Sequence, residues 1–211
     1  MKCRLHIEIR PETVIFLCED SGQTALPWQK AGFSTICVDK AHDGQDVRLI
    51  KSMEILGLLK KHDLAPLGLF AMPPCTHFAG SGARWWQGKG EKPLLEALSV
   101  SNACLRIEWV LRRHGLKWVA VENPVGRLSQ YLGEPSMTFQ PCDFGDPYTK
   151  RTCLWGDFNT DVPKNVVAPI EGSRMLKLSP SADRAKLRSE TPEGFAKAFC
   201  EANRPDSTKS R

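Results

Sequence analysis

The sequence lacks several features that mark specialised protein classes. None of its eight cysteines forms a C-x-x-C pair, which argues against a zinc ribbon, and no metal site is predicted. The cysteines are too widely spaced for a secreted disulfide scaffold. We therefore expect most of them to be small buried core residues in a reducing compartment.

Long apolar runs are missing too. The first ten residues, MKCRLHIEIR, contain no apolar stretch of signal-peptide length. No segment approaches the roughly 20 apolar residues that a transmembrane helix needs. Internal repeats are also missing. These absences predict a soluble protein of the cytoplasm.

The remaining composition is that of an ordinary globular protein. The chain has 211 residues, 41% of them hydrophobic, which is enough for one domain with a real core. We expect a single domain over residues 1–203 and a disordered polar tail over 204–211. The formal charge of +5 is compatible with a polyanionic partner without requiring one.

Short apolar runs alternate with segments of helical periodicity. Strands are expected at Val14–Cys18, Ser34–Asp39, Leu67–Met72, Trp118–Val121 and Thr152–Trp155. Helices are expected at Thr24–Ala31, Val47–Lys61, Pro93–His114 and Pro192–Asn203, the last with Thr191 as its N-cap. This alternation predicts an α/β fold with a doubly wound, mostly parallel sheet, whose ligands bind at the carboxyl ends of the strands.

A cysteine directly follows the third predicted strand. Two prolines, Pro73 and Pro74, precede Cys75, and their fixed backbone holds it rigidly at the strand end. Most isolated cysteines are inert and buried. The two prolines before Cys75 and the glycine-rich loop after it favour a nucleophile instead.

The fourth predicted strand ends in Glu122-Asn123-Pro124. A glutamate there is unfavourable unless it is paired, and alone it would indicate a helix cap or an ion pair. One long helix connects the strand of Cys75 to the strand of Glu122. The two side chains could therefore face one cleft.

Taken together, these motifs resemble the C5-cytosine DNA methyltransferases. That family has a Pro-Cys nucleophile, then Glu-Asn-Val or Glu-Asn-Pro, and then a segment similar to Asp-Tyr-Gly-x-Pro-Gln-x-Arg-x-Arg. This sequence has PPC at 73–75, ENP at 122–124 and DFGDPYTKR at 143–151, in the same order. The resemblance covers roughly residues 14–156 and implies a Rossmann-like, S-adenosylmethionine-dependent methyltransferase.

The resemblance also implies catalytic roles. Cys75 would add to carbon 6 of cytosine, which makes carbon 5 nucleophilic toward a methyl group. Glu122 would donate a proton to ring N3. Lys150 and Arg151 lie where the family has its arginines and would assist the cytosine carbonyl and bind phosphate. Alternatively, the two bases belong to an exposed basic strand edge.

The cofactor side matches the family less closely. Of the family's Phe-x-Gly-x-Gly, only Gly22 is retained in Cys18–Gly22. The resemblance implies that Asp20, Gly22 and Pro73 line the cofactor site, that Asp39 binds the ribose and that Asp46 meets the adenine amino group. For both Asp39 and Asp46 a helix N-cap is the alternative.

The substrate side is assigned to the loop after Cys75 and to two motif residues. Arg84, Trp85 and Trp86 combine a cation with stacking surfaces, as in nucleic-acid-binding loops. In the family this loop closes over a flipped base. Alternatively, it is a surface loop with one tryptophan packed in the core. The resemblance adds Pro74 and Asn123 to the substrate site.

The interval 157–188 stands where family members insert a large target-recognition domain. It is too short for a second domain, so we expect low or short sequence specificity, or specificity supplied by a partner. Compact enzymes of this kind occur in phages and prophages, so the resemblance implies the cytoplasm of a bacterial or phage-infected cell. Three functions stay open: DNA methylation, modification of free deoxycytidine nucleotides or transfer of an altered group from a modified donor, and DNA binding by an inactive relative.

Overall fold

A six-stranded sheet forms the centre of the molecule, with the strand order β2-β1-β3-β4-β6-β5. The computed structural model describes residues 11–19, 21–40, 44–177 and 184–205. The strands are β1 (Glu12–Leu17), β2 (Ser34–Val38), β3 (Ala65–Ala71), β4 (Trp118–Pro124), β5 (Met137–Phe139) and β6 (Thr152–Trp155). The first four run parallel, and β6 is antiparallel to β4 and to β5.

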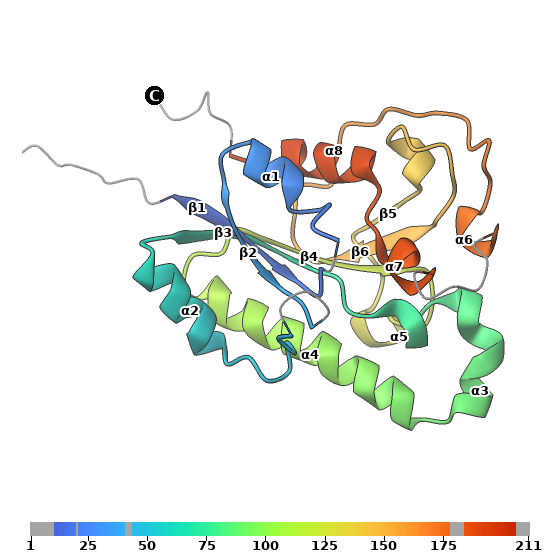
Figure 1. Ribbon diagram of the computed structural model, residues 1–211, viewed down its shortest axis with the longest axis horizontal. Coiled ribbons are helices and arrows are strands. Elements are labelled where there is room, and N and C mark those ends of the chain that lie inside the picture. Colours follow the sequence, from blue (N-terminus) through green and yellow to red (C-terminus); the bar gives the residue numbers. More distant parts are fainter. Residues whose placement is uncertain (1–10, 20, 41–43, 178–183, 206–211) are drawn as a thin grey trace, which may run out of the picture.

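Helices cover both faces of the sheet (Figure 1). On one face lie α2 (Ser52–Lys61) and α4 (Lys92–Arg112), and on the other lie α1 (Leu26–Lys30) and α8 (Glu193–Asn203). The alternation of β1 shows why: Ile15 and Leu17 pack toward α2 and α4, whereas Val14 and Phe16 pack toward α1 and α8. Apolar residues on both faces are typical of a buried parallel strand. The predicted doubly wound α/β fold is confirmed.

The predicted strands were found, but the sheet contains one more. β5 is only three residues long, too short to give a periodic signal. β4 is longer than predicted and continues through Glu122 to Pro124, because these residues pair with β6. Glu122 and Asn123 therefore belong to the sheet itself.

The predicted helix over 47–61 was wrong at its start. It begins at Ser52, because the Asp46 carboxylate accepts a hydrogen bond from the backbone N–H of Arg48 and holds a turn there. The Glu54 carboxylate then accepts from the backbone N–H of Lys51 and caps the helix.

The other predicted helices also differ at their ends. α1 begins at Leu26 and α4 ends at Arg112, with Gly115 at φ 96° beyond it. Thr191 is not the N-cap of α8, which starts after Pro192. Instead its buried hydroxyl lies 2.8 Å from that of Thr24.

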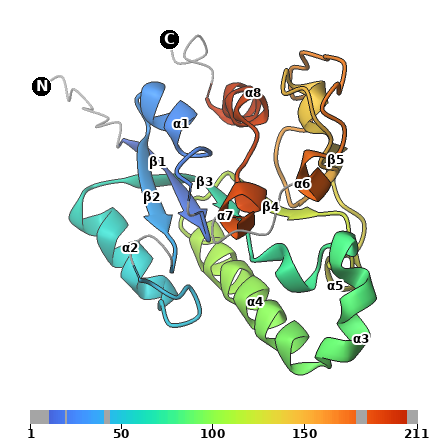
Figure 2. The same ribbon diagram turned by 45° about the vertical axis from the view of Figure 1, so that its right-hand side comes forward.

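The two predicted loops contain short helical turns. After β3 come 3-10 turns at Cys75–His77 and Gly80–Trp85, followed by α3 (Trp86–Lys89). After β4 come α5 (Ser129–Leu132) and the 3-10 turn Pro141–Asp143; α6 (Arg174–Lys177) and α7 (Arg184–Ser189) follow β6. α7 lies near the arrowhead ends of the parallel strands in both views (Figures 1 and 2). Of the predicted disordered tail, residues 206–211 lie outside the described residues.

The strand order creates a switch point between β1 and β3. From β1 the chain crosses to β2 on one side, and β3 then pairs with β1 on the other. Connections leave in opposite directions at such a point, which opens a crevice at the carboxyl ends of the strands. The residues after β1 and β3 are Cys18–Gly22 and Met72–Cys75.

Candidate active site

Cys75 lies at the carboxyl edge of the sheet, where the chain leaves β3. The backbone N–H of Met72 still donates to Leu17 of β1 at 2.9 Å. Pro73 and Pro74 have no N–H to continue the ladder, so the chain leaves the sheet, and Cys75 starts a 3-10 turn. The thiol is half-buried, so it is held by the fold without being sealed in the core.

Cys75 and Glu122 line the same small cavity. This central cavity, of about 60 Å3, lies beyond the ends of β1, β3 and β4. It is lined by Cys18, Glu19, Ser21, Met72, Pro73, Pro74, Cys75, Glu122, Pro124, Lys150, Arg188 and Ser189. The structure thus brings together Cys75, Glu122 and Lys150, as well as Pro73 and Pro74.

Burial dominates the acid–base character of Glu122. It raises the pKa of the carboxyl group above its usual range, and the charge of Lys150 offsets only part of this effect. A raised pKa increases the protonated fraction at a given pH. Glu122 can therefore act as a proton donor closer to neutral pH than an exposed glutamate can.

Opposing effects act on the Cys75 thiol. Burial raises its pKa most, followed by the negative charge of Glu122, whereas Lys150 and Arg188 lower it. The balance is a raised pKa, so the thiolate is scarcer at neutral pH than for an exposed cysteine. The two cations make the thiol more acidic than burial alone would.

Asn123 connects the two motifs. Its side chain is fully buried, and its Nδ2 atom donates to the carbonyl oxygen of Pro73 at 2.8 Å. Its Oδ1 atom has no hydrogen-bond partner among the described residues. The visible role of Asn123 is to tie the end of β3 to β4, and its predicted contact with substrate stays a prediction.

The two predicted basic residues, Lys150 and Arg151, differ in the cavities that they line. The Nζ atom of Lys150 donates to the carbonyl oxygen of Glu190 at 3.2 Å and lies at the central cavity. Arg151 is exposed and lines a neighbouring outer cavity of about 320 Å3. The outer cavity is lined by Cys75, Ala79, Ser81, Pro124, Val125, Gln140, Thr149, Lys150, Arg151, Ser173 and Arg188.

A third cavity contains two of the predicted cofactor residues. This side cavity, of about 460 Å3, includes Asp39 from the end of β2 and Asp46. It shares Cys18 and Pro74 with the central cavity, so the two are neighbours. Its remaining lining comes from Val38, Lys40, Gln45, Val47, Arg48, His77, Glu96, Ala97 and Val100.

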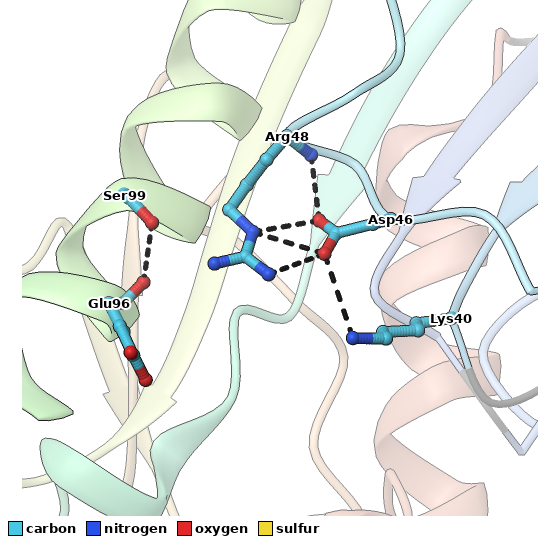
Figure 3. A network of polar contacts seen from close by, with 5 residues as sticks. All are labelled: Lys40, Asp46, Arg48, Glu96 and Ser99. Atoms are coloured by element: carbon cyan, nitrogen blue, oxygen red, sulfur yellow. Dashed lines mark hydrogen bonds and ion pairs between the residues drawn. The ribbon is translucent and has the colours of Figure 1, made fainter.

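The carboxylate of Asp46 is held by two cations (Figure 3). The Nε atom of Arg48 donates to it at 2.9 Å, and the ammonium of Lys40 lies 3.8 Å away. These contacts, chiefly the Arg48 hydrogen bond, lower the pKa of Asp46 to about 2. Asp46 is therefore ionised and fixed in orientation at neutral pH, and it caps no helix.

The loop after β1 is organised by a buried acid. The carboxylate of Glu19 accepts from the Ser21 hydroxyl at 2.6 Å and from the Gly22 N–H at 2.8 Å. Gly22 has φ 72°, a conformation that favours glycine. Asp20, which we predicted to bind cofactor, lies outside the described residues.

The two predicted tryptophans differ in environment. Trp85 is 58% exposed, and the Arg84 guanidinium lies 5.0 Å from the centre of its ring. Trp86 is half-buried against the guanidinium of Arg127, at 4.3 Å. Trp85 is thus the more exposed of the two rings and the better placed to stack on a base, while Trp86 packs against Arg127.

Sequence reasoning missed three residues at the site. Glu19 could have been found, because an acid directly after a buried strand needs a partner. Arg127 donates from Nε to the carbonyl oxygen of His77 at 2.7 Å, and Arg188 lines the central cavity. These two arginines gave no signal, since their positions depend on how separate segments pack.

The structure gives no sign of metal ligation or membrane insertion in the parts it describes. No group of three or more His, Cys, Asp or Glu residues there could hold a metal ion. Among the described helices, none has both the length and the apolar character needed to span a membrane.

Comparisons with known proteins give distant structural likenesses. No protein-family model and no curated protein sequence matches the chain. A solved structure assigned as a DNA modification methyltransferase encoded within a prophage of Escherichia coli is 18% identical, with a TM-score of 0.47, and the match covers 81% of this chain. A mutant of DNMT2 from Spodoptera frugiperda is 15% identical, with a TM-score of 0.41 and 74% coverage.

The chain spans about half the length of these two proteins, 49% of the first and 53% of the second. Likenesses this distant say nothing about activity.

Proposed function

We propose that the chain is an S-adenosylmethionine-dependent methyltransferase that modifies carbon 5 of cytosine in DNA. One observation carries this proposal: the Cys75 thiol and the Glu122 carboxyl line one small cavity at the ends of adjacent parallel strands. A nucleophile and a proton donor facing one cavity can act on a single ring.

Cys75 is the nucleophile in this scheme. Its thiol loses a proton, and the sulfur forms a bond to carbon 6 of the cytosine ring. The ring electrons then make carbon 5 nucleophilic toward the methyl group that the cofactor would supply. Once carbon 5 carries this methyl group, water takes its proton, the C5–C6 double bond re-forms and the bond from carbon 6 to sulfur breaks, which releases the thiolate. Lys150 and Arg188 favour the thiolate electrostatically, against the burial that disfavours it.

Glu122 is the proton donor to ring N3. The attack on carbon 6 places negative charge on the ring, and a proton at N3 neutralises it. Burial keeps this carboxyl protonated to higher pH than usual. Lys150 lies at the same cavity, where its ammonium can stabilise the carbonyl oxygen of the ring.

The side cavity fits S-adenosylmethionine, which would supply an electrophilic methyl group there. Its volume of about 460 Å3 lies in the range of cofactor pockets. Asp39 and Asp46 offer carboxylate acceptors for ribose hydroxyls and for an amino group, and Val38, Val47 and Val100 provide apolar walls. The cavity also borders the cavity of Cys75.

DNA is the proposed substrate because cations line the outer side of the cavity and the loop that follows Cys75 carries an exposed aromatic ring. Arg151 and Arg188 lie on its outer side, and Trp85 with Arg84 lies on the loop that follows Cys75. Cations bind phosphates, and an exposed tryptophan can stack on a base.

Covalent trapping tests the proposal. DNA containing 5-fluorocytosine should form a stable adduct with the protein in the presence of S-adenosylmethionine, because fluorine cannot leave as a proton does. The adduct should map to Cys75 by peptide mass spectrometry. It should vanish in Cys75→Ser and persist in Cys37→Ala, a half-buried cysteine of β2.

Two results would overturn the proposal. Methylation of cytosine by Cys75→Ser at the wild-type rate would exclude the covalent mechanism. Methylation of dCMP, with none of DNA, would exclude DNA as the substrate while retaining the chemistry.

A further inference from the structure

Arg188 joins two segments that are far apart in the sequence. It lies near the end of α7, in the short interval that follows β6. Its Nη2 atom donates to the Ser81 hydroxyl at 3.0 Å, and Ser81 belongs to the loop after Cys75. Figure 2 shows α7 beside the ends of the parallel strands. Arg188 therefore connects α7 to the loop that follows the proposed nucleophile, and it lines the same cavity as Cys75.

Arg188 also lines two cavities at once. The central cavity and the outer cavity share Cys75, Pro124, Lys150 and Arg188. A ligand can therefore place one group beside the Cys75 thiol and another in the outer cavity. A nucleotide has this form, with a base at one end and a phosphate at the other.

The lining of the outer cavity is positive. It contains Lys150, Arg151 and Arg188, and none of its lining residues is acidic. Among the described residues, none of these three cations lies within ion-pair distance of a carboxylate. The neutral lining adds donors from Ser81, Thr149, Ser173 and Gln140. Cations beside hydroxyl and amide donors suit a phosphate group.

We propose that the outer cavity is a phosphate subsite and that Arg188 binds the phosphate of the nucleotide whose cytosine enters the central cavity. This inference rests on the proposed function and adds a residue and a ligand group to it. The phosphate is either a diester of a DNA strand or the monoester of a free nucleotide.

The geometry of arginine explains how Arg188 can do this while bound to Ser81. A guanidinium has five N–H donors, and the bond to Ser81 uses one of them. The others can bind phosphate oxygens, often two at a time. Phosphate binding would then strengthen the contact between α7 and the loop that carries Ser81.

A binding experiment tests the subsite without requiring methyl transfer. Labelled cytosine oligonucleotides are titrated with the full chain, with either natural phosphates or one neutral methylphosphonate beside the target cytosine, placed 5′ or 3′. One of these positions should weaken wild-type binding by about tenfold, the value of a charge-assisted hydrogen bond. Arg188→Gln should weaken binding of the natural strand to a similar extent.

The decisive observation is whether Arg188→Gln and the methylphosphonate lower the affinity independently of each other. In the Arg188→Gln variant the same methylphosphonate should lower the affinity little further, because the contact between Arg188 and the phosphate is already lost. Arg188→Lys should recover part of the affinity through its charge. Arg113→Gln is the matched control, since Arg113 stacks on Trp109 at the end of α4, at 3.3 Å from the ring centre, and should leave this coupling unchanged.

Competition with small molecules distinguishes the two sources of phosphate. If the subsite takes a monoester, dCMP should displace the oligonucleotide far better than deoxycytidine, and only in proteins that retain Arg188. If it takes the diester, the methylphosphonate effect appears and dCMP competes no better than deoxycytidine. The inference would be overturned if the affinity losses caused by Arg188→Gln and by the methylphosphonate were additive and dCMP competed no better than deoxycytidine.

Failure of the inference can be separated from failure of the proposed function. If Arg188→Gln binds and methylates DNA as the wild type does, the subsite is wrong and the Cys75 chemistry stands. If the wild type forms no adduct at Cys75 yet shows the Arg188–phosphate coupling, the subsite stands and the chemistry is wrong.

Discussion

At the scale of single residues, burial and the neighbouring charges together set the pKa of one thiol. Burial and Glu122 raise the pKa of Cys75, and Lys150 and Arg188 lower it. A nucleophilic cysteine reacts as the thiolate, so its thiol must be able to ionise. The structure adds the opposing effect of burial, so the cations are needed to make the thiolate accessible.

Removing the charge of Glu122 should make Cys75 more acidic. Above the pKa of Glu122 its carboxylate raises the pKa of the thiol, so Glu122→Gln lowers that pKa and increases the thiolate fraction. We expect alkylation of Cys75 by iodoacetamide at pH 8 to become several-fold faster. The rate is measured by peptide mass spectrometry over a pH series.

Lys150→Gln should have the opposite effect, moving the pH midpoint of alkylation upward, because a cation that lowers the thiol pKa is lost. Glu201→Gln, an exposed residue of α8, should leave the midpoint in place. A midpoint that moves upward in Glu122→Gln would contradict this electrostatic account.

At the scale of elements, the loops after β3 and β4 form one unit. The Gly80 N–H donates to the Val125 carbonyl at 2.8 Å, and the Arg127 N–H donates to the Phe78 carbonyl at 2.9 Å. Gly126 packs so closely that a Cβ there would overlap the Phe78 carbonyl oxygen. The position of Cys75 relative to Glu122 depends on this contact as well as on the sheet.

Gly126→Ala should therefore separate the two loops. We expect a loss of about 2 kcal/mol or more in the free energy of unfolding, the usual range for forced overpacking, together with altered alkylation of Cys75. Denaturant unfolding measures the first effect and labelling the second.

Gly57→Ala is the matched control. Gly57 lies in α2, with open space where a Cβ would stand. Alanine favours a helix over glycine by about 0.5–1 kcal/mol, so this variant should be slightly stabilised. Equal stability of the two variants would contradict the close packing of Gly126.

A second feature at this scale is the paired carboxylate of Asp46, between β2 and α2. Arg48 orients the carboxylate of Asp46 at the side cavity. If Asp46 binds the adenine amino group, Arg48→Ala should weaken S-adenosylmethionine binding several-fold, as measured by calorimetry. The double variant with Asp46→Asn should be little weaker than Asp46→Asn alone, because both changes affect one contact.

Lys60→Ala, an exposed residue of α2, should bind the cofactor normally. Full additivity of Arg48→Ala and Asp46→Asn would show that Arg48 does not act through Asp46. Binding should also stay constant between pH 5 and 8 as far as Asp46 is concerned, since its pKa is about 2 and it remains ionised throughout.

At the scale of the whole molecule, three neighbouring cavities follow one edge of the sheet. The side, central and outer cavities share lining residues in sequence, first Cys18 and Pro74, then Cys75 and Lys150. The proposed cofactor, base and phosphate would occupy them in that order. From the interval 157–188, Ser173 and Arg188 line this site.

An interval this short should limit sequence recognition. We expect methylated cytosines to occur in many contexts, or to share a motif of very few bases, when DNA is treated with the protein and S-adenosylmethionine. Bisulfite sequencing gives the distribution. A long, strict recognition motif produced by the purified chain alone would contradict the expectation.

The sequence by itself determined the class of fold and indicated which residues to expect at the site. Apolar runs of strand length, alternating with helical periodicity, specify a covered parallel sheet, and the PPC and ENP motifs fall where strands end. These signals are local, so they can be read along the chain. The short strand β5 and the start of α2 at Ser52 were not predicted. The first depends on strand pairing, and the second depends on a turn held by one side chain.

Only the tertiary structure decided which of these residues meet, and with what partners. It placed Glu122 within β4, buried Asn123 against Pro73, packed Trp86 against Arg127 and brought Arg188 to the cavity of Cys75. The physical reason is that burial and charge at a site are sums over segments distant in sequence. The raised pKa of Cys75 and the positive outer cavity therefore belong to the folded molecule and have no signature in any one segment.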